Sequence, residues 1–412
     1  MSDTPSNVTP ITQAVPDNSR LTVALMECEM ALRCYTARLN LITGSIDIDA
    51  QTTRNRPMDM DDLTTTMHSD LSGKYKGVSL DVMRAYIALI AKDLAYNPVL
   101  DMMDGLTWDG VDRFPEVFEL LGINDDELSK VLVRKWMYQA VALLFNDMRD
   151  PFGADGVLVF NGAQGVGKTS FFRHLAVNPA WFLEGATIKD NDKDTTRRIV
   201  TRWISELGEV ESTLKSDISA LKAFVTSSVD TYRRPYGRSD IESPRYTSLC
   251  ATCNSDRYLI DTTGNRRWWT VPILQRIPYD AIQQLDAHQL WAQVYATVEP
   301  LPYHEKKRCF RLTPEQARAL DQRNGDVEKF LKGEDECRDL IDTARNTPGT
   351  IWEYMTITQW RTRNLAALGK YSTGQIGQAL QHIGIKQEQK RLGGSKSPSR
   401  VYLLPSFTEN IE

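Results

Sequence analysis

The chain has 412 residues and a net charge of −5, and 41% of its residues are hydrophobic while 25% are charged. This length predicts two or three domains with an ample buried core. The mild acidity excludes a protein that coats nucleic acid by bulk charge, although it is compatible with a local basic groove. The sequence has no run of about 18 apolar residues, so we expect no membrane span.

The first 19 residues are polar and rich in Pro and Ser. They lack the basic start and apolar stretch of a signal peptide, so we expect a disordered lead-in. Six cysteines are scattered along the chain, which is typical of the reducing cytoplasm. Cys250 and Cys253 form one C-x-x-C, but no second pair lies at zinc spacing. We interpret them as packed thiols.

Residues 20–145 are predicted to be mainly helical. Apolar residues recur there every three or four positions, in segments 20–39, 80–95 and 128–145. A short strand pair is expected within residues 39–50, where Thr43-Gly44-Ser45 resembles a tight turn.

Residues 146–275 alternate strand-like and helix-like segments, which predicts an α/β core with a parallel sheet. Residues 276–345 return to helix and loop. Residues 346–405 are expected to form a separate small domain with two helices, the second capped by Ser372, then a basic Gly-Ser hairpin and a strand. This order indicates a winged helix, a fold that binds either DNA or other proteins.

A phosphate-binding loop follows the apolar run GVLVF. Gly162, four residues, Gly167, Lys168 and Thr169 match G-x-x-x-x-G-K-[ST] in full. Glycines let backbone N–H groups converge on phosphate, Lys168 reaches the β/γ-phosphates, and the Thr169 hydroxyl binds Mg²⁺. The residues expected to bind nucleotide are Gly162, Ala163, Gln164, Gly165, Val166, Gly167, Lys168, Thr169 and Ser170.

Two further polar residues are expected at strand ends. In RRIVTRWISELGEVE, apolar residues lead to Glu206, our candidate for holding the Mg²⁺ shell or orienting the attacking water. Ser205 stands where a second acid is usual, and Glu209 is an alternative. In LCATCNSDRYL, Asn254 ends a strand-like run and is expected near the γ-phosphate or the lytic water.

The order of these elements, followed by arginines about a dozen residues later, resembles the superfamily 3 helicases of the AAA+ class. It is more specifically similar to the virulence-associated E family of phage and mobile-element proteins. The similarity spans roughly residues 95–275 and is carried by WDGVDRF, GAQGVGKTSFF, WISELGEVE, LKAFVTSSVDTYRRPYGR, ATCN and DTTGNRRWW.

The resemblance implies a ring-forming ATPase, with a hexamer as the expected ring, that uses ATP and Mg²⁺ and moves on DNA during replication. Lys168, Thr169, Glu206 and Asn254 would act within one subunit. An arginine of the next subunit would complete the site. Arg267 is the better match to this arginine finger by its spacing from Asn254, and its neighbour Arg266 is the alternative.

In the resembled helicases, the interval before Asn254 holds a hairpin that projects into the DNA channel. Its basic and aromatic residues are candidates for phosphate contact and base stacking: Tyr232, Arg233, Arg234, Tyr236, Arg238 and Arg245. The competing interpretation is a basic loop packed at a subunit interface or near the nucleotide.

Two rival functions use the same phosphate loop. A replication initiator would switch its oligomeric state with ATP and unwind little DNA, and its C-terminal domain would recruit replication partners. A small-molecule kinase would be a monomer with a lid. The Asn-then-Arg order after the acidic strand argues against the kinase.

Overall fold

The protein is seen in a computed structural model. The structure describes residues 19–50, 58–187, 193–208, 218–233, 240–254, 265–326, 334–391 and 399–406. Candidate residues Glu209, Arg234, Tyr236 and Arg238 lie outside these ranges, as does most of the expected lead-in.

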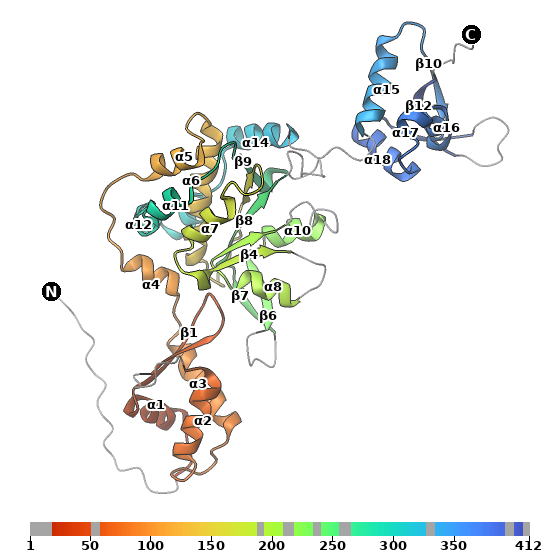
Figure 1. Cartoon of the computed structure of the whole chain (residues 1–412). Helices are drawn as coiled ribbons and strands as arrows, with labels where there is room; N and C mark the ends of the chain where they lie inside the picture. Colours follow the sequence, from red (N-terminus) through yellow and green to blue (C-terminus); the bar gives the residue numbers. More distant parts are fainter. Residues whose placement is uncertain are drawn as a thin grey trace.

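A small α+β unit comes first, coloured red to orange in Figure 1. Its elements are α1 (Val23–Leu32), β1 (Tyr35–Leu39), β2 (Ile46–Ala50), α2 (Met60–Leu71) and α3 (Leu80–Asp93). β1 and β2 pair antiparallel, and Gly44 takes a φ of 68° in the turn, a conformation that favours glycine. An antiparallel strand pair is present, but its first strand spans Tyr35–Leu39 instead of lying within residues 39–50. The helix predicted over residues 20–39 is too long, since α1 ends at Leu32, two residues before Cys34 with its φ of 55°.

This N-terminal unit has a core of its own. Buried methionines from its three helices meet there: Met26, Met30, Met60, Met67 and Met83. Each helix begins at a residue whose side chain accepts a hydrogen bond from a backbone N–H, namely Thr22, Asp59 and Ser79. The unit therefore buries its apolar faces largely by itself.

The next helices belong to the central body of the protein. They are α4 (Pro98–Asp104), α5 (Phe114–Leu121), α6 (Glu127–Ala142) and the 3₁₀ turn η1 (Leu143–Phe145). Trp136 of α6 is fully buried, and its indole N–H donates to the Leu249 carbonyl at 2.8 Å. Residues 98–145 thus pack on the predicted α/β core, so the expected division at residue 145 does not separate two hydrophobic cores.

The centre of the fold is a parallel sheet with strand order β4-β5-β8-β3-β9. Its described strands are β3 (Val157–Asn161), β4 (Phe182–Ala186), β5 (Ile204–Leu207), β8 (Ser248–Cys253) and β9 (Trp268–Pro272), all parallel. The chain has an α/β core, as predicted. Because the strands run the same way, their carboxyl ends share one edge of the sheet, which we call the carboxyl edge, and the opposite one is the amino edge.

Two layers of helices cover the sheet. The helical connections between its strands are α7 (Lys168–Leu175), η2 (Pro179–Trp181), α8 (Lys193–Val200), α10 (Ile218–Val225) and η3 (Asn265–Arg267). An antiparallel hairpin of β6 (Val229–Arg233) and β7 (Asp240–Pro244) projects below them in Figure 1. Trp269 packs with α6, α7 and α12 on one face, whereas Trp268 packs with α8 and α10 on the other. The two tryptophans thereby anchor β9 on both sides.

The segment after β9 completes the central body. It contains α11 (Tyr279–Gln284), α12 (Ala287–Val298), α13 (Tyr303–Lys306) and α14 (Pro314–Asp326). Trp291 of α12 is fully buried against Trp203, the residue before β5, with ring centroids 4.6 Å apart. These helices are part of the core, which therefore extends beyond the expected bound at residue 275.

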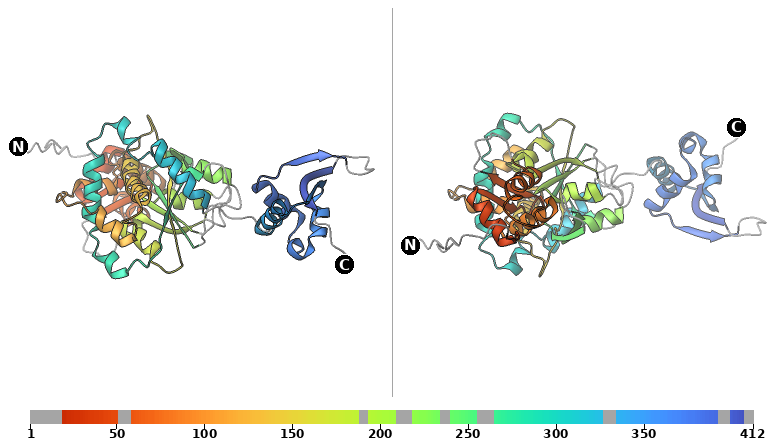
Figure 2. Two further views of the ribbon diagram at one scale, coloured as in Figure 1. Left: turned by 90° about the horizontal axis from the view of Figure 1, so that it is seen from above. Right: turned by 90° about the horizontal axis from the view of Figure 1, so that it is seen from below.

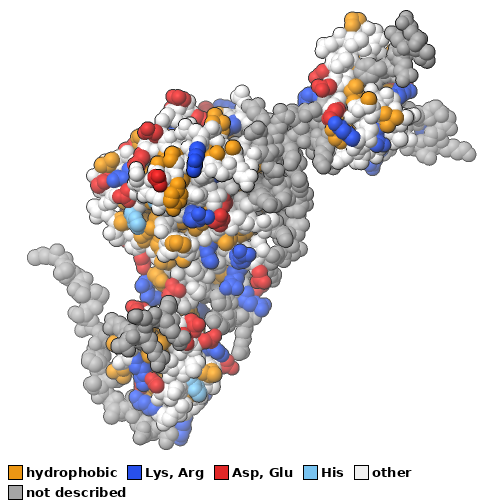
Figure 3. All heavy atoms as spheres, in the orientation of Figure 1, with side chains coloured by type: hydrophobic (Ala, Val, Ile, Leu, Met, Phe, Trp, Pro, Cys, Tyr) orange, Lys and Arg blue, Asp and Glu red, His pale blue; other side chains and the backbone are white. Residues whose placement is uncertain are grey.

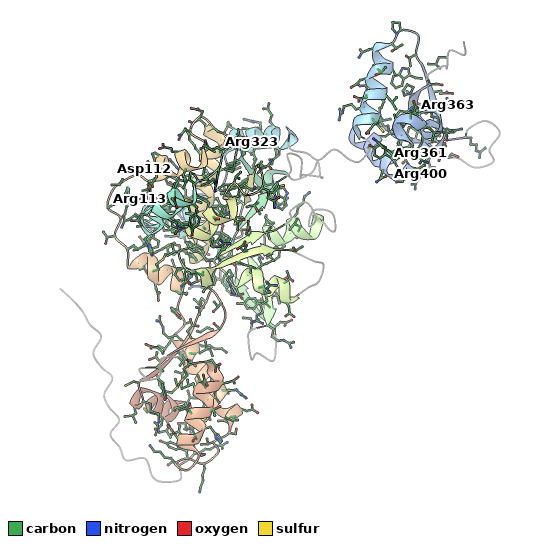
Figure 4. All side chains as sticks on the ribbon, viewed as in Figure 1. Asp112, Arg113, Arg323, Arg361, Arg363 and Arg400 are labelled. Atoms are coloured by element: carbon green, nitrogen blue, oxygen red, sulfur yellow. The ribbon has the colours of Figure 1, made fainter. Side chains whose placement is uncertain are left out.

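The WDGVDRF segment docks on α12. Gln293 accepts from the Arg113 backbone N–H at 2.9 Å and donates to Asp112 at 2.6 Å. Gln289, one turn earlier, accepts from the Asp109 backbone N–H at 3.0 Å. Figure 4 labels Asp112 and Arg113 beside the α12 ribbon. The motif that carried part of the family resemblance therefore has a structural role here, since it fastens α5 to α12.

The last unit has a three-stranded antiparallel sheet with order β10-β12-β11. Its elements are α15 (Glu334–Asn346), β10 (Ile351–Met355), α16 (Ile357–Arg363), α17 (Leu365–Leu368), α18 (Thr373–His382), β11 (Gln387–Lys390) and β12 (Ser399–Ser406). The Ser372 hydroxyl caps α18, as predicted, by accepting from the Gln375 N–H. Figure 2 shows this unit as a separate body in both views. Cys337 and Ile341 of α15 belong to its core, so the unit begins before residue 346.

Candidate nucleotide-binding site

The loop between β3 and α7 is shaped by close backbone approach. A Cβ on Gly162 would lie 2.2 Å from the Ile273 carbonyl oxygen, which leaves no room for a side chain. Gly165 and Gly167 take φ values of 78° and 100°, which other residues rarely adopt. The loop thus presents main chain at the carboxyl edge, directly before the N-terminus of α7, where an anion is favoured.

Lys168 closes this loop from within. Its side chain is 5% exposed, and its ammonium donates to the carbonyls of Gly162 at 2.8 Å and Ala163 at 2.7 Å. It also donates to Asn254 Oδ1 at 2.9 Å. Burial lowers the pKa of Lys168. The three acceptors hold the charged group at the mouth of the loop, within reach of any phosphate bound there.

Glu206 lies on β5 and is 2% exposed. One of its oxygens, Oε1, accepts from the Thr169 hydroxyl at 2.7 Å and from the Thr252 hydroxyl at 2.8 Å. Burial raises the pKa of the Glu206 carboxyl, and the two hydroxyl donors oppose that effect in part. A buried carboxylate with a raised pKa, beside the loop between β3 and α7, is suited to accept a proton.

Thr252 was missed by the reasoning from sequence. It stands two residues before Asn254 on β8, so both side chains project from the same face of the strand. Once Asn254 is suspected, this period of two is the signal that points to Thr252. Its hydroxyl donates to the same Glu206 oxygen that accepts from Thr169.

The sheet order explains why these residues meet. The acidic strand β5 does not neighbour β3, because β8 lies between them. Cys253 pairs with Asn161 on one side of β8, and Cys250 pairs with Glu206 on the other. The end of β8 therefore brings Asn254 to the ammonium of Lys168, while Thr252 reaches the carboxylate of Glu206.

The oxygen donors of this site fit Mg²⁺. Thr169 and Glu206 present a hydroxyl and a carboxylate 2.7 Å apart, and oxygen ligands are those that Mg²⁺ prefers. In the described part of the chain, no group of three or more His, Cys, Asp or Glu side chains gathers as a metal site. Cys250 and Cys253 are buried on β8.

The arginine pair lies at the other edge of the sheet. Arg266 and Arg267 end η3, immediately before β9, and Trp268 pairs with Val157 at the start of β3. The phosphate loop begins after Asn161, four residues later, which is about 13 Å along the strand. Arg266 is exposed, and the buried Nε of Arg267 has no hydrogen-bond partner in the described chain.

Helix α14 holds the strand that carries these arginines. Asn324 donates to the Trp268 carbonyl at 2.9 Å and accepts from the Thr270 hydroxyl at 2.6 Å. Arg323, labelled in Figure 4, donates to the Thr270 carbonyl at 3.2 Å and to Asp126 at 2.7 Å. The outer edge of β9 is thereby fastened to α14 and α6. No motif in the sequence marks these residues.

Two of the residues predicted to contact DNA are buried. Arg245 is 1% exposed, with a bidentate pair to Asp230 and a bond from Nη1 to the Phe224 carbonyl at 2.5 Å. Tyr232 is 3% exposed. Neither side chain offers a surface to DNA, so we correct both predictions. Arg233 is exposed and faces Asp240 at 3.7 Å, so it is the described member of that set that solvent reaches.

A comparison with known protein families identifies the family of this chain. The family model of the virulence-associated protein E-like domain matches residues 103–329, which is more than half of the chain. The chain belongs to this family. The match spans α5 to α14 and so includes the phosphate loop, Glu206, Asn254 and the arginine pair, as the resemblance of the sequence implied.

Solved structures give weaker likenesses. The apo structure of the NrS-1 C-terminal region has 12% identity and a TM-score of 0.49, over 93% of this virulence-associated E-like chain and 99% of that one. The JCV helicase, bound to a small molecule, has 10% identity and a TM-score of 0.26, over 68% of this chain and 82% of that one. No curated protein gives a match. No helix in the described residues is long and apolar enough for a bilayer crossing.

Proposed function

We propose that this virulence-associated E-like protein is an ATP-dependent DNA helicase or translocase that acts in the replication of a phage or mobile element. We propose further that it works as a ring, of hexameric size in the superfamily 3 pattern. One observation carries the proposal: the phosphate-site residues meet at the carboxyl edge of the sheet, while Arg266 and Arg267 lie at the amino edge, where the buried Nε of Arg267 has no hydrogen-bond partner in the described residues.

Within one subunit, each residue of the site has its own proposed role in ATP binding or hydrolysis. The phosphate loop binds the triphosphate by its backbone, and Lys168 exchanges its carbonyl partners for phosphate oxygens. Asn254, released by Lys168, is then placed to orient the attacking water. Glu206 accepts a proton from that water. Mg²⁺, held by Thr169 and Glu206, would neutralise charge on the β- and γ-phosphate oxygens.

The arginines act on a neighbouring subunit in this proposal. Because about 13 Å of strand separates Arg267 from the phosphate loop of its own chain, its side chain cannot reach that γ-phosphate. A head-to-tail ring brings the amino edge of one subunit to the carboxyl edge of the next. Arg267 is the favoured arginine finger because its buried Nε has no hydrogen-bond partner in the described residues, whereas the Arg266 side chain is exposed to solvent.

DNA contact is proposed for the hairpin side of the core. Figure 3 shows Lys and Arg side chains gathered over α8 and β6, where Arg198 and Arg233 are exposed. Arg234, Tyr236 and Arg238 stay predictions for the tip that joins β6 to β7. Phosphate neutralisation by these cations would supply affinity without sequence preference.

The C-terminal unit is proposed to be a winged-helix domain. Its order of helix, strand, helices and hairpin, with β12 between β10 and β11, supports this assignment. Arg400 is exposed at the start of β12. We propose that this domain contacts DNA or replication partners.

Replacement of Lys168 by Ala tests the proposal. With DNA and Mg²⁺ present, the wild type should hydrolyse ATP faster than without DNA and should displace a strand, and K168A should do neither. Lys92→Ala, which removes an exposed lysine of α3, is the matched control and should keep both activities. A wild type without either activity overturns the proposal. Footprints confined to one origin sequence, with no strand displacement, would instead favour the initiator.

A further inference from the structure

A short segment after β9 forms one wall of the phosphate loop. The Ile273 N–H donates to the Asn161 carbonyl at 2.6 Å, and the Ile277 N–H donates to the Val166 carbonyl at 2.8 Å. The carbonyl oxygens of Ile273 and Ile277 lie where a Cβ would stand on Gly162 and Gly167. The segment is therefore fixed along the whole length of the loop.

Two large apolar side chains of this wall face solvent. Leu274 is 90% exposed and Tyr279 is 60% exposed. By contrast, Ile273, directly before Leu274, and Ile277, two residues before Tyr279, are buried. Single exposed apolar residues need no explanation. Here, however, two of them flank both ends of a loop that is built for phosphate, and the backbone that bears them is held rigidly.

The sheet order gives the direction in which a bound nucleotide must lie. Glu206 and Asn254, which act at the γ-phosphate, both lie on the β8 side of β3. With the γ-phosphate on the β8 side, the β- and α-phosphates extend along the loop away from β8. The nucleoside therefore lies on the opposite side of β3. That side is occupied by β9 and the segment that follows it.

We infer that Leu274 and Tyr279 form the nucleobase-binding surface of this site. The inference rests on the proposed nucleotide function and deepens it. The tyrosine ring stacks on a base, and the leucine covers its apolar edge. Stacking and apolar contact depend on the area of the base rather than on its hydrogen-bonding groups. Purine nucleotides, with the larger base, should therefore bind more tightly than pyrimidine nucleotides.

Two ligands separate base contact from phosphate contact. The dissociation constants of ATP and of inorganic tripolyphosphate, both with Mg²⁺, are measured by calorimetry on the full chain. Tyr279→Ala and Leu274→Ser should each weaken ATP about tenfold and leave tripolyphosphate unchanged. Tyr279→Phe keeps the ring and should bind ATP as the wild type does. Leu32→Ser, an exposed leucine of α1, is the control for loss of a surface leucine.

The other outcomes overturn the inference in distinct ways. Equal weakening of ATP and tripolyphosphate would mean that the segment only supports the loop. Unchanged ATP binding in both variants would mean that the base lies elsewhere. Loss of ATP binding together with a lower sedimentation coefficient would make this surface a subunit contact. A wild type that binds neither ligand would instead refute the proposed nucleotide function itself.

Discussion

The two edges of the central sheet differ in how far a single chain completes them. At the carboxyl edge, Lys168, Thr169, Glu206 and Asn254 are joined by hydrogen bonds within the chain. At the amino edge, Arg267 keeps a buried Nε without a partner in the described residues. The first edge carries the residues of the proposed ATP site within one chain, whereas the second would need a neighbouring subunit to complete the proposed finger contact. The contrast explains why we place ATP at one edge and a second copy at the other.

The largest effect on ATP hydrolysis is expected from a substitution at the amino edge. Arg267→Ala should lower ATP hydrolysis by on the order of 10³-fold or more, since an arginine finger contributes about that factor. ATP affinity and melting temperature should stay close to wild type because the buried Nε of Arg267 has no hydrogen-bond partner in the described residues. Steady-state hydrolysis, calorimetry and thermal melting measure the three quantities.

A mixing experiment tests whether that effect acts between subunits. Rings that combine Lys168→Ala with Arg267→Ala subunits contain some interfaces with both wild-type residues, so part of the activity should return. Absence of recovery in confirmed mixed rings would place the role of Arg267 within one chain, or in Arg266 instead.

The next effect concerns the carboxyl edge. Glu206→Gln should lower hydrolysis by about 10²- to 10⁴-fold while ATP still binds, because an amide accepts the two threonine hydrogen bonds but not a proton. Burial raises the pKa of Glu206 in the folded state, so the wild type loses stability as pH rises through that value. The stability advantage of the variant should therefore grow from acid to neutral pH, as thermal melts at several pH values would show. A difference that does not vary with pH would contradict the buried carboxylate.

Arg245 sharpens the comparison because it is an arginine whose partner lies in the same chain. Arg245→Ala leaves Asp230 buried and uncompensated, and should cost about 3–5 kcal/mol of unfolding free energy. The double variant Arg245→Met with Asp230→Leu removes both charges and should recover most of that loss. Urea unfolding measures both. A single variant as stable as wild type would show that the pair is not formed.

The smallest effect belongs to exposed Arg233. Arg233→Ala should leave stability unchanged and should reduce the salt dependence of single-stranded DNA affinity, by about 0.7 in the log–log slope for one lost phosphate contact. Binding at several salt concentrations gives the slope. An unaltered slope would remove Arg233 from the DNA surface.

The sequence was most informative where chemistry demands particular residues at a fixed spacing. The glycines and Lys168 of the phosphate loop are required together, and Glu206 ends an apolar run in a buried strand, so their positions could be predicted. The insertion of β8 between β3 and β5 could not, because strand order depends on packing across the whole sheet. Thr252 was hidden for the same reason, since an ordinary strand threonine acquires its role only from the neighbouring Glu206.

Charge was the least informative signal. Arg233 and Arg245 look alike in a basic stretch, yet Arg245 pairs with Asp230, fifteen residues earlier, across the hairpin. Whether an arginine is available to a ligand depends on that partner rather than on its neighbours in sequence. Likewise, α14 was placed outside the predicted core because nothing in the sequence around Arg323 and Asn324 indicates that these polar residues bind a strand.

The hold of α14 on β9 also affects how the chain matures on the ribosome. Arg323 reaches Asp126 across 197 residues of sequence, so the central body cannot close until α14 has left the exit tunnel. Until then, β9 exposes the carbonyls of Trp268 and Thr270 along an open strand edge, which invites pairing with other nascent chains. Release of residues up to 326 from the exit tunnel is thus the step at which α14 covers the open edge of β9.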